Sequence, residues 1–299
     1  MRFTSSSLSL VLLAACASAS SGGRAPLPAP PEAPTLFAPG IVSSAAPEFA
    51  ITFTPDLRTL YFNRATADRS SLTIMESRWT GTAWSAPRVA SFSGIHRDVD
   101  PFVSSDGRRV YFSSSRPGGV GAAGNLDTWF VERTSAGWGD PRNAGRPFNT
   151  DSNDVFVSET RDGTTIVGSN RAGAARIFAS RRRADSWEEP QALSAGAPGD
   201  GNALISPSGR FLVHVRTTPS GGADLWVACR TADGWSASTP LQGGVNSTFA
   251  DFAPALSPDE RLLFFTSERP GVAPAVPAGT RPPGDIYAIG TAAAGIDCA

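Results

Sequence analysis

Short apolar runs alternate with short polar clusters along most of the chain, and this pattern predicts β-strands separated by turns. The stretch from Asp100 to Pro141 shows it most clearly, with four runs rich in β-branched and aromatic residues. Asp106-Gly107 is the strongest turn signal in it, because an Asp-Gly pair accepts the positive φ of a tight hairpin. No stretch has a sustained helical period, so we expect the chain to contain almost no helix.

The same unit recurs five times from Glu48 onward, as an inner strand, a turn, a second strand and a third strand. In the first four units a Trp and then a Pro follow: Trp84/Pro87, Trp138/Pro141, Trp187/Pro190 and Trp235/Pro240. The four Trp residues are separated by 54, 49 and 48 positions, which is near the length of one propeller blade. The repeat predicts an all-β fold, a five-bladed β-propeller of four-stranded antiparallel blades over residues 34–290.

The fifth unit stops after its third strand, and the missing piece lies at the other end of the chain. Residues 34–42 resemble the segments that follow Pro87, Pro141 and Pro240. We therefore expect the N-terminal strand to complete the last blade, because a closed ring leaves no exposed strand edge. Residues 291–299 would form a C-terminal tail.

Parts of the repeat resemble a known family. Ser104 to Gly119, Ser257 to Gly271 and Asp285-Ile286-Tyr287 are similar to the Ser-Pro-Asp-Gly, Ser-x-Arg-Pro-Gly-Gly and Asp-Ile-Tyr motifs of WD40-like, TolB-like propeller repeats. The chain departs from this pattern at Arg161, where the turn Pro is expected, and at Ser208, which replaces the turn Asp. The resemblance implies an envelope or periplasmic protein that acts as a binding scaffold.

The N-terminus reads as a targeting segment. Arg2 supplies a positive charge, Leu8 to Ala15 is apolar, and Leu13-Ala14-Ala15-Cys16 resembles a bacterial lipobox. Residues 1–16 would then be a lipoprotein signal with Cys16 as the lipidated residue, although ordinary cleavage at a small-residue site is the alternative. Residues 17–33 would form a Ser/Gly- and Pro-rich tether. This predicts a periplasmic-side protein in the bacterial envelope, attached to the membrane only through its lipid, and Ser18 favours the outer membrane.

Composition excludes several classes of function. The formal net charge is −1, which gives no electrostatic case for nucleic acid. None of the 26 basic residues is Lys, which rules out Schiff-base and P-loop lysine chemistry, and no motif predicts a cofactor. No C-x-x-C pair exists and His96 lies far from His214, so no zinc site is expected. An oxidising compartment would permit a bridge between Cys229 and Cys298, but the sequence does not place them within reach.

A polar, mostly acidic residue opens each inner strand, and an Arg follows each second strand. A hairpin brings both positions to one rim of a propeller, around the mouth of its channel. Structural ion pairing is the preferred interpretation, and a site for a cation or a basic peptide is the alternative. The acidic or polar positions are Glu48, Asp100, Asp154, Asn202 with Asp200 nearby, and Asp251. The arginines are Arg64, Arg116, Arg171, Arg216 and Arg269.

No convincing catalytic constellation emerges from the sequence. Turn carboxylates such as Asp106 recur too regularly for an active site and are expected to form Asx-turns, and His214 falls within a strand, where core packing is expected. The leading hypothesis is a binding or scaffolding propeller for a protein or an envelope polymer. The alternative is a glycoside hydrolase that uses two carboxylates at the channel mouth, Asp98 and Asp100 with Asp154 or Asp251.

Overall fold

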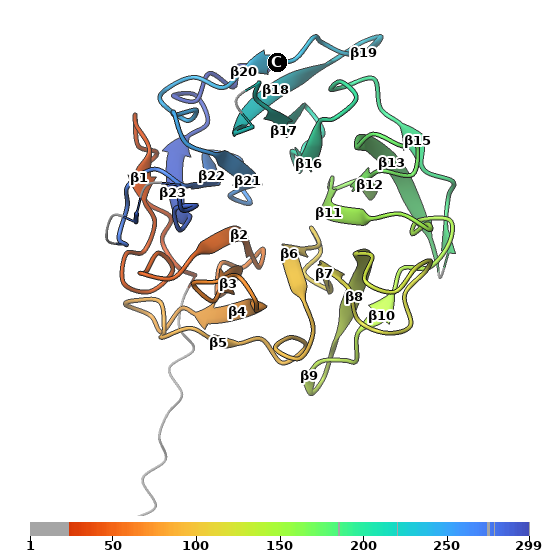
Figure 1. The fold of residues 1–299 in the computed structure, drawn as a ribbon, viewed down its shortest axis with the longest axis horizontal. Helices are drawn as coiled ribbons and strands as arrows, with labels where there is room; N and C mark the ends of the chain where they lie inside the picture. Colours follow the sequence, from red (N-terminus) through yellow and green to blue (C-terminus); the bar gives the residue numbers. More distant parts are fainter. Residues whose placement is uncertain (1–23, 185, 220, 274–275, 278, 299) are drawn as a thin grey trace, which may run out of the picture.

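The computed structural model describes residues 24–184, 186–219, 221–273, 276–277 and 279–298. Within these ranges the chain forms strands and turns and no helix, and none of its segments is a helix suited to spanning a membrane. Five antiparallel sheets stand around a common axis, as Figure 1 shows. The predicted all-β, five-bladed propeller is confirmed.

Each blade is a meander whose first strand lies nearest the axis. Blade 1 holds β2 (Glu48–Phe53), β3 (Thr59–Ala65), β4 (Leu72–Arg78) and β5 (Arg88–Val89). Blade 2 holds β6 (Asp98–Val103), β7 (Arg109–Ser114), β8 (Asp127–Thr134), β9 (Gly137–Trp138) and β10 (Arg142–Asn143). Blade 3 holds β11 (Asp154–Glu159), β12 (Thr164–Ser169), β13 (Arg176–Arg183), β14 (Ser186–Trp187) and β15 (Gln191–Ala192). Blade 4 holds β16 (Gly201–Ile205), β17 (Phe211–Thr217), β18 (Ala223–Thr231), β19 (Gly234–Trp235) and β20 (Thr239–Pro240).

Blade 5 is built from both ends of the chain. It holds β21 (Asp251–Leu256), β22 (Leu262–Ser267), β23 (Asp285–Gly290) and the N-terminal β1 (Thr35–Leu36). Thr35 lies opposite Ala288, and the Phe37 amide donates to the Ile286 carbonyl at 2.9 Å. The expected closure by the N-terminal strand is therefore confirmed.

Apolar side chains fill each interface between neighbouring blades, with one buried cluster per interface. At the closing interface Phe37 meets the rings of Phe53 and Phe264 edge-on, at centroid distances of 5.9 and 5.1 Å. A buried aromatic side chain contributes several kcal/mol, so about 3–5 kcal/mol of stability depends on such a contact. Because every sheet is covered on both faces, the strands read as nearly continuous apolar runs.

A disulfide adds a second link between blades. Cys229 in β18 bonds Cys298 in the C-terminal tail, with 5.4 Å between the two Cα atoms. The tail also packs back on blade 4, where the Gln242 amide donates to the Ala294 carbonyl. The bond joins positions 69 residues apart, so it constrains the unfolded chain over the segment that holds β21, β22 and β23. The sequence had left this pairing open.

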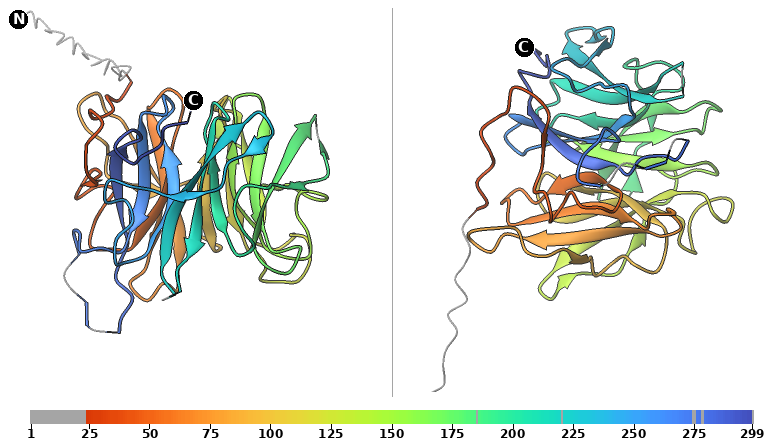
Figure 2. Two further views of the ribbon diagram at one scale, coloured as in Figure 1. Left: turned by 90° about the horizontal axis from the view of Figure 1, so that it is seen from above. Right: turned by 60° about the vertical axis from the view of Figure 1, so that its left-hand side comes forward.

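The described part of the expected tether lies against the propeller. Ala25 is 2% exposed, and its amide donates to the Leu57 carbonyl in the β2–β3 turn. The Pro31 carbonyl accepts the Gly290 amide at the end of β23. Both contacts are at the end of the blades where the inner strands finish, here called the turn face, and the left view of Figure 2 places the C-terminus on that face too. Cys16 and the predicted signal lie outside the described residues.

Candidate functional site

Each blade carries one buried carboxylate at the start of its inner strand, and an arginine holds it. We call Glu48, Asp98, Asp154, Asp200 and Asp251 the carboxylate ring; each of them is at most 2% exposed. The arginine partners are Arg64 at 2.7 Å, Arg116 at 2.7 Å, Arg171 at 2.7 Å, Arg216 at 2.8 Å and Arg269 at 3.0 Å, in the same order. Of the predicted residues, Glu48, Asp154, Asp251, Arg116, Arg171 and Arg269 lie in this arrangement.

Asp100 does not belong to the carboxylate ring, which corrects the sequence alignment. Asp98 lies opposite Ser114 and receives Arg116, as Asp154 lies opposite Ser169 and receives Arg171. Asp100 comes two residues later, at a β-bulge that the sequence pattern does not reveal. For the same reason Asp200 belongs to the ring, and Asn202 corresponds to Asp100.

Arginine reaches the ring by two routes. Arg64 lies directly opposite Glu48, and Arg216 binds both oxygens of Asp200. In the other three blades the arginine comes two residues after a serine, as in Ser169-x-Arg171, and its Nε donates to that serine's hydroxyl. The serine of the Ser-x-Arg motif therefore positions the arginine. Blade 1 does not use this motif, since Arg64 reaches Glu48 from the residue directly opposite, and for this reason Arg64 comes earlier in its unit.

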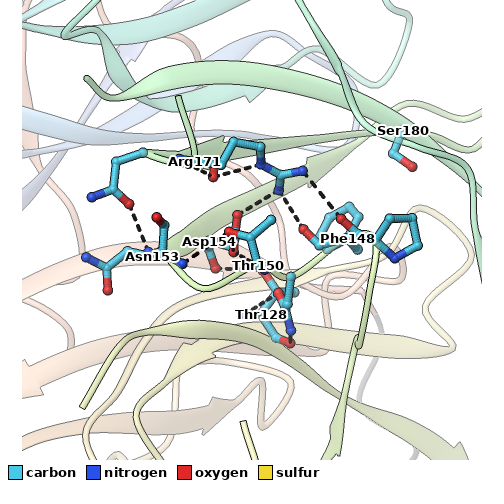
Figure 3. Close-up of polar contacts among 12 residues, drawn as sticks. Thr128, Phe148, Thr150, Asn153, Asp154, Arg171 and Ser180 are labelled. Atoms are coloured by element: carbon cyan, nitrogen blue, oxygen red, sulfur yellow. Dashed lines mark hydrogen bonds and ion pairs between the residues drawn. The ribbon is translucent and has the colours of Figure 1, made fainter. Parts of the chain in front are cut away.

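Figure 3 shows the blade 3 site. One Asp154 oxygen accepts from Arg171, and the other accepts from the Thr150 amide at 2.6 Å and the Thr150 hydroxyl at 2.8 Å. Arg171 also donates to the Phe148 carbonyl at 2.6 Å. Both carboxylate oxygens are thus occupied by the protein, and the pair fastens the incoming loop to the blade.

The ring carboxylates share this saturated environment. Burial raises the pKa of Glu48 above its ordinary value, although Ser44 and Arg64 oppose the effect. Burial acts the same way on Asp200, but hydrogen bonds from Arg216 and Ala197 outweigh it and lower its pKa. Among the described residues no cluster of His, Cys, Asp and Glu could hold a metal ion. The geometry is that of five structural clamps.

The channel inside the ring is apolar and nearly filled. Every inner strand has its bulge at the same place, with one residue at positive φ: Ala50, Asp100, Phe156, Asn202 and Ala253. Ala50, Phe156 and Ala253 form a buried cluster there with Leu204, and Phe102 packs against it. The remaining space is a cavity of about 50 Å³ with Asp100 in its wall. The channel is therefore a packed core and not an open pore.

A larger cavity of about 360 Å³ opens above this core, on the face opposite the turn face. We call it the arginine mouth. Its polar wall is formed by Arg69, Arg97, Asp100 and Arg281. Its apolar wall is formed by Phe49, Leu72, Val99, Leu126, Val155 and Phe252. Its volume falls within the range of small-molecule sites, although at the lower end.

Asp100 breaks the fivefold pattern of the inner-strand bulges with a charge. Two of the four corresponding positions are Ala50 and Ala253, and the others are Phe156 and Asn202. No described residue donates a hydrogen bond to the Asp100 carboxyl, although its amide donates to Asn63. Burial raises the pKa of Asp100 to about 7, with the Arg97 guanidinium opposing the shift.

At the turn face, the end of the channel is crossed by an arginine. A cavity of about 240 Å³ there is lined by Pro55, Pro207 and Pro258 together with Arg161. Arg161, the residue that departs from the repeat, donates to the Pro258 carbonyl at 3.0 Å and pairs with Glu260 at 3.1 Å. The departure thus joins blade 3 to blade 5 across the axis. The expected Asx-turns are present, since the Ser104 hydroxyl and the Arg108 amide both donate to Asp106.

His214 lies in a buried chain of polar groups. Its Nε2 is 2.9 Å from the Ser238 hydroxyl, and its Nδ1 is 3.3 Å from Asp200. The order resembles a catalytic triad, but His214 is fully buried and Arg216 binds both oxygens of Asp200. Burial lowers the pKa of His214, which keeps the imidazole neutral. His214 is a core histidine, as the sequence led us to expect; its Nε2 bonds Ser238, and its Nδ1 has no hydrogen-bond partner among the described residues.

Comparisons with known proteins identify the fold. Neither a family model nor a curated protein matches this chain. Among solved structures, the putative TolB from Agrobacterium tumefaciens has 17% identity and a TM-score of 0.50 over 74% of this chain and 70% of its own. TolB from Acinetobacter baumannii has 15% identity and a TM-score of 0.50, and the match spans 82% of this chain but only 54% of that protein.

A second group of similar structures has another description. The catalytic domain of the GH62 α-L-arabinofuranosidase from Coprinopsis cinerea has 12% identity and a TM-score of 0.51, over 87% of this chain and 98% of its own. At such identities both likenesses show the propeller fold alone. They leave the function to be argued from this chain's own residues.

Removing one side of a ring clamp should destabilise the fold strongly. Arg171→Ala would leave the buried Asp154 carboxylate without a cation, and we expect the free energy of unfolding to fall by about 3–5 kcal/mol. Arg183→Ala is the matched control, because Arg183 is 66% exposed and pairs with Glu188 at the surface; we expect a loss below about 1 kcal/mol. Urea unfolding followed by Trp fluorescence measures both, and equal small losses would contradict the structural role of the ring.

Proposed function

We propose that this chain is a non-catalytic binding module of the bacterial envelope that presents its arginine mouth to a protein or an envelope polymer. The observation that carries the proposal is the composition of that mouth. Three guanidinium groups and one unpartnered carboxyl surround a cavity with apolar walls, whereas the carboxylates of the ring are already occupied by arginines.

The position of the mouth supports the same proposal. The first described residues leave the propeller from the turn face, where Ala25 contacts Leu57. The mouth lies at the other end of the blades, beside the β22–β23 loop that contributes Arg281. If Cys16 carries a lipid, residues 17–23 span at most about 25 Å. The turn face would then lie near the membrane, and the mouth would face away from it toward a partner.

Hydrolysis of a glycosidic bond fits this geometry less well. It requires two carboxyl groups roughly 5–9.5 Å apart on either side of the bond. Asp100 is the only carboxylic acid in the walls of the arginine mouth and of the small cavity beneath it, among the residues that the structure describes. Asp98, Asp154 and Asp251, which the alternative would use, are buried beneath their arginines.

Capture of envelope components by the full-length protein tests the mouth as the binding surface. We expect wild-type protein, purified in detergent, to retain a partner that the double variant Arg97→Glu, Arg281→Glu loses. Arg183→Glu, which changes an exposed arginine on blade 3, should retain it. Capture that is equal in all three proteins would refute the mouth as the binding surface. Release of reducing sugar from a glycan panel that Asp100→Asn abolishes would favour the enzyme instead.

Membrane attachment through Cys16 has its own test. We expect wild-type protein to sediment with membranes after lysis and Cys16→Ser to move to the soluble fraction, because the lipid on Cys16 is the proposed membrane attachment. Separation of inner and outer membranes by density would then identify the membrane, for which Ser18 favours the outer one. A wild-type protein that is already soluble after lysis would refute the anchor.

A further inference from the structure

The arginine mouth has more positive charge than its own carboxylates balance. Arg69 and Arg281 share a single carboxylate, Glu268, and Arg69 also donates to the Pro282 carbonyl at 3.1 Å. Arg97 is exposed and forms no ion pair or side-chain hydrogen bond with any described residue. Burial and the neighbouring Arg281 both lower the pKa of Arg69, as mutual repulsion within a cationic cluster does.

The walls of the mouth select for more than charge. Phe49 and Phe252 pack against each other in its wall, with 6.5 Å between ring centroids and 42° between ring planes, and the Arg281 guanidinium lies 5.7 Å from the Phe252 ring centre. Leu72, Leu126 and Val155 complete the apolar lining. A simple inorganic ion would leave these surfaces wet. A ligand that joins an anionic group to an apolar body would cover both kinds of wall.

We propose that the arginine mouth binds a carboxylate on an apolar body, with Arg97 and Arg281 as its cationic partners and the Asp100 carboxylic acid as an additional hydrogen-bond donor. This inference rests on the proposed function and specifies the chemistry of the same site. A free organic acid and the C-terminal carboxylate of a peptide with an apolar last residue both satisfy it. Arginine suits the task because its planar fork matches a carboxylate with two parallel hydrogen bonds.

Asp100 distinguishes this site from a simple cationic patch. An ionised Asp100 would repel an incoming carboxylate, whereas the protonated acid has an O–H to donate to it. Its carboxyl lies at the boundary between the apolar core and the mouth, and no described side chain competes for that proton. Burial favours the protonated form and keeps it populated near neutral pH. Carboxylate binding should therefore strengthen as the pH falls through 7.

The groups that face Asp100 set the design of the test. Arg97 immediately precedes β6, the strand of Asp100; Arg69 comes from the β3–β4 turn, and Arg281, which pairs with Glu268, comes from the β22–β23 loop. His96 is an exposed imidazole beside Arg97. The variant Asp100→Asn keeps His96 and every arginine, so it isolates the contribution of Asp100.

Isothermal titration of the full-length protein with four probes measures the effect. N-acetyl-phenylalanine and a short peptide ending in Phe each carry the carboxylate, and their amides are the neutral controls. We expect both acids to bind and both amides to bind at least roughly tenfold more weakly. The tighter of the two acids identifies the source as a free acid or a peptide terminus. Arg97→Gln should weaken the acids roughly tenfold, and Arg183→Gln should leave them unchanged.

The pH dependence gives the second readout. We expect the wild-type dissociation constant to rise roughly tenfold from pH 6 to pH 8, and the ratio for Asp100→Asn to be near one. The unliganded variant should also be more stable than wild type at pH 8. A carboxyl whose pKa is raised in the fold contributes stability below pH 3.8 that is lost as the pH rises through about 7, and Asn has no such loss. This gain confirms that the variant folds.

Three results would overturn the inference. The acids and their amides could bind equally, the acids could fail to bind, or a cationic probe such as phenethylamine could bind wild type and not Asp100→Asn. The proposed function can stand when this inference fails. If the Arg97→Glu, Arg281→Glu variant loses its envelope partner and N-acetyl-phenylalanine does not displace that partner from wild type, the mouth is a binding surface of a different chemistry.

Discussion

The pairing of β1 with β23 is the interaction on which the rest of the structure depends. Without it the third strand of blade 5 would present a free edge, and the interface between blades 5 and 1 would lose Phe37 from its core. A propeller distributes its core among the interfaces between blades, so an open ring would have one incomplete layer and a strand available for aggregation. Closure also fixes the spacing of the five inner strands, and thereby the size of the channel and of its mouth.

Residues that recur in every blade and residues that depart from the repeat have different roles in this molecule. The features that recur in every blade are structural: the carboxylate ring, the turn hydroxyls and the inter-blade clusters all satisfy buried groups or fill space. Two features that occur once lie on the axis. Asp100 stands where other blades have Ala, Phe or Asn, and Arg161 stands where a turn Pro is expected. One of these departures closes the turn face, and the other gives the mouth its unpartnered acid.

Much of this architecture could be predicted from the sequence because it follows from the regular spacing of the repeated units. Alternating apolar runs, Trp spacing and a missing outer strand gave the blade count and the closure, and acidic strand starts followed by arginines gave the ion pairs. The two-residue shift between Asp98 and Asp100 could not be predicted, since a bulge adds a residue without changing the hydrophobic pattern. The structure also corrects the alignment of blade 4. The Leu241 amide donates to the Leu225 carbonyl as the Ala90 amide donates to the Ile74 carbonyl in blade 1. Counting back three residues from each shows that Ser238, and not Pro240, corresponds to Pro87.

The arginine mouth could not be predicted from the sequence for another reason. Arg69, Arg97 and Arg281 come from three loops in three blades, and none of them belongs to a repeated motif. Only the closed ring brings them within one cavity. The same holds for the disulfide, because Cys229 and Cys298 meet only when the tail returns across blade 4. Contacts of this kind depend on tertiary geometry that no local pattern records.

Hydrogen–deuterium exchange of the intact protein, resolved by mass spectrometry, tests the closed ring most directly. If β1 seals blade 5, peptides covering Thr35–Phe37 and β23 should exchange as slowly as those covering the central strand β22. Rapid exchange of β23 beside a protected β22 would show a free edge and an open ring, and would contradict the account.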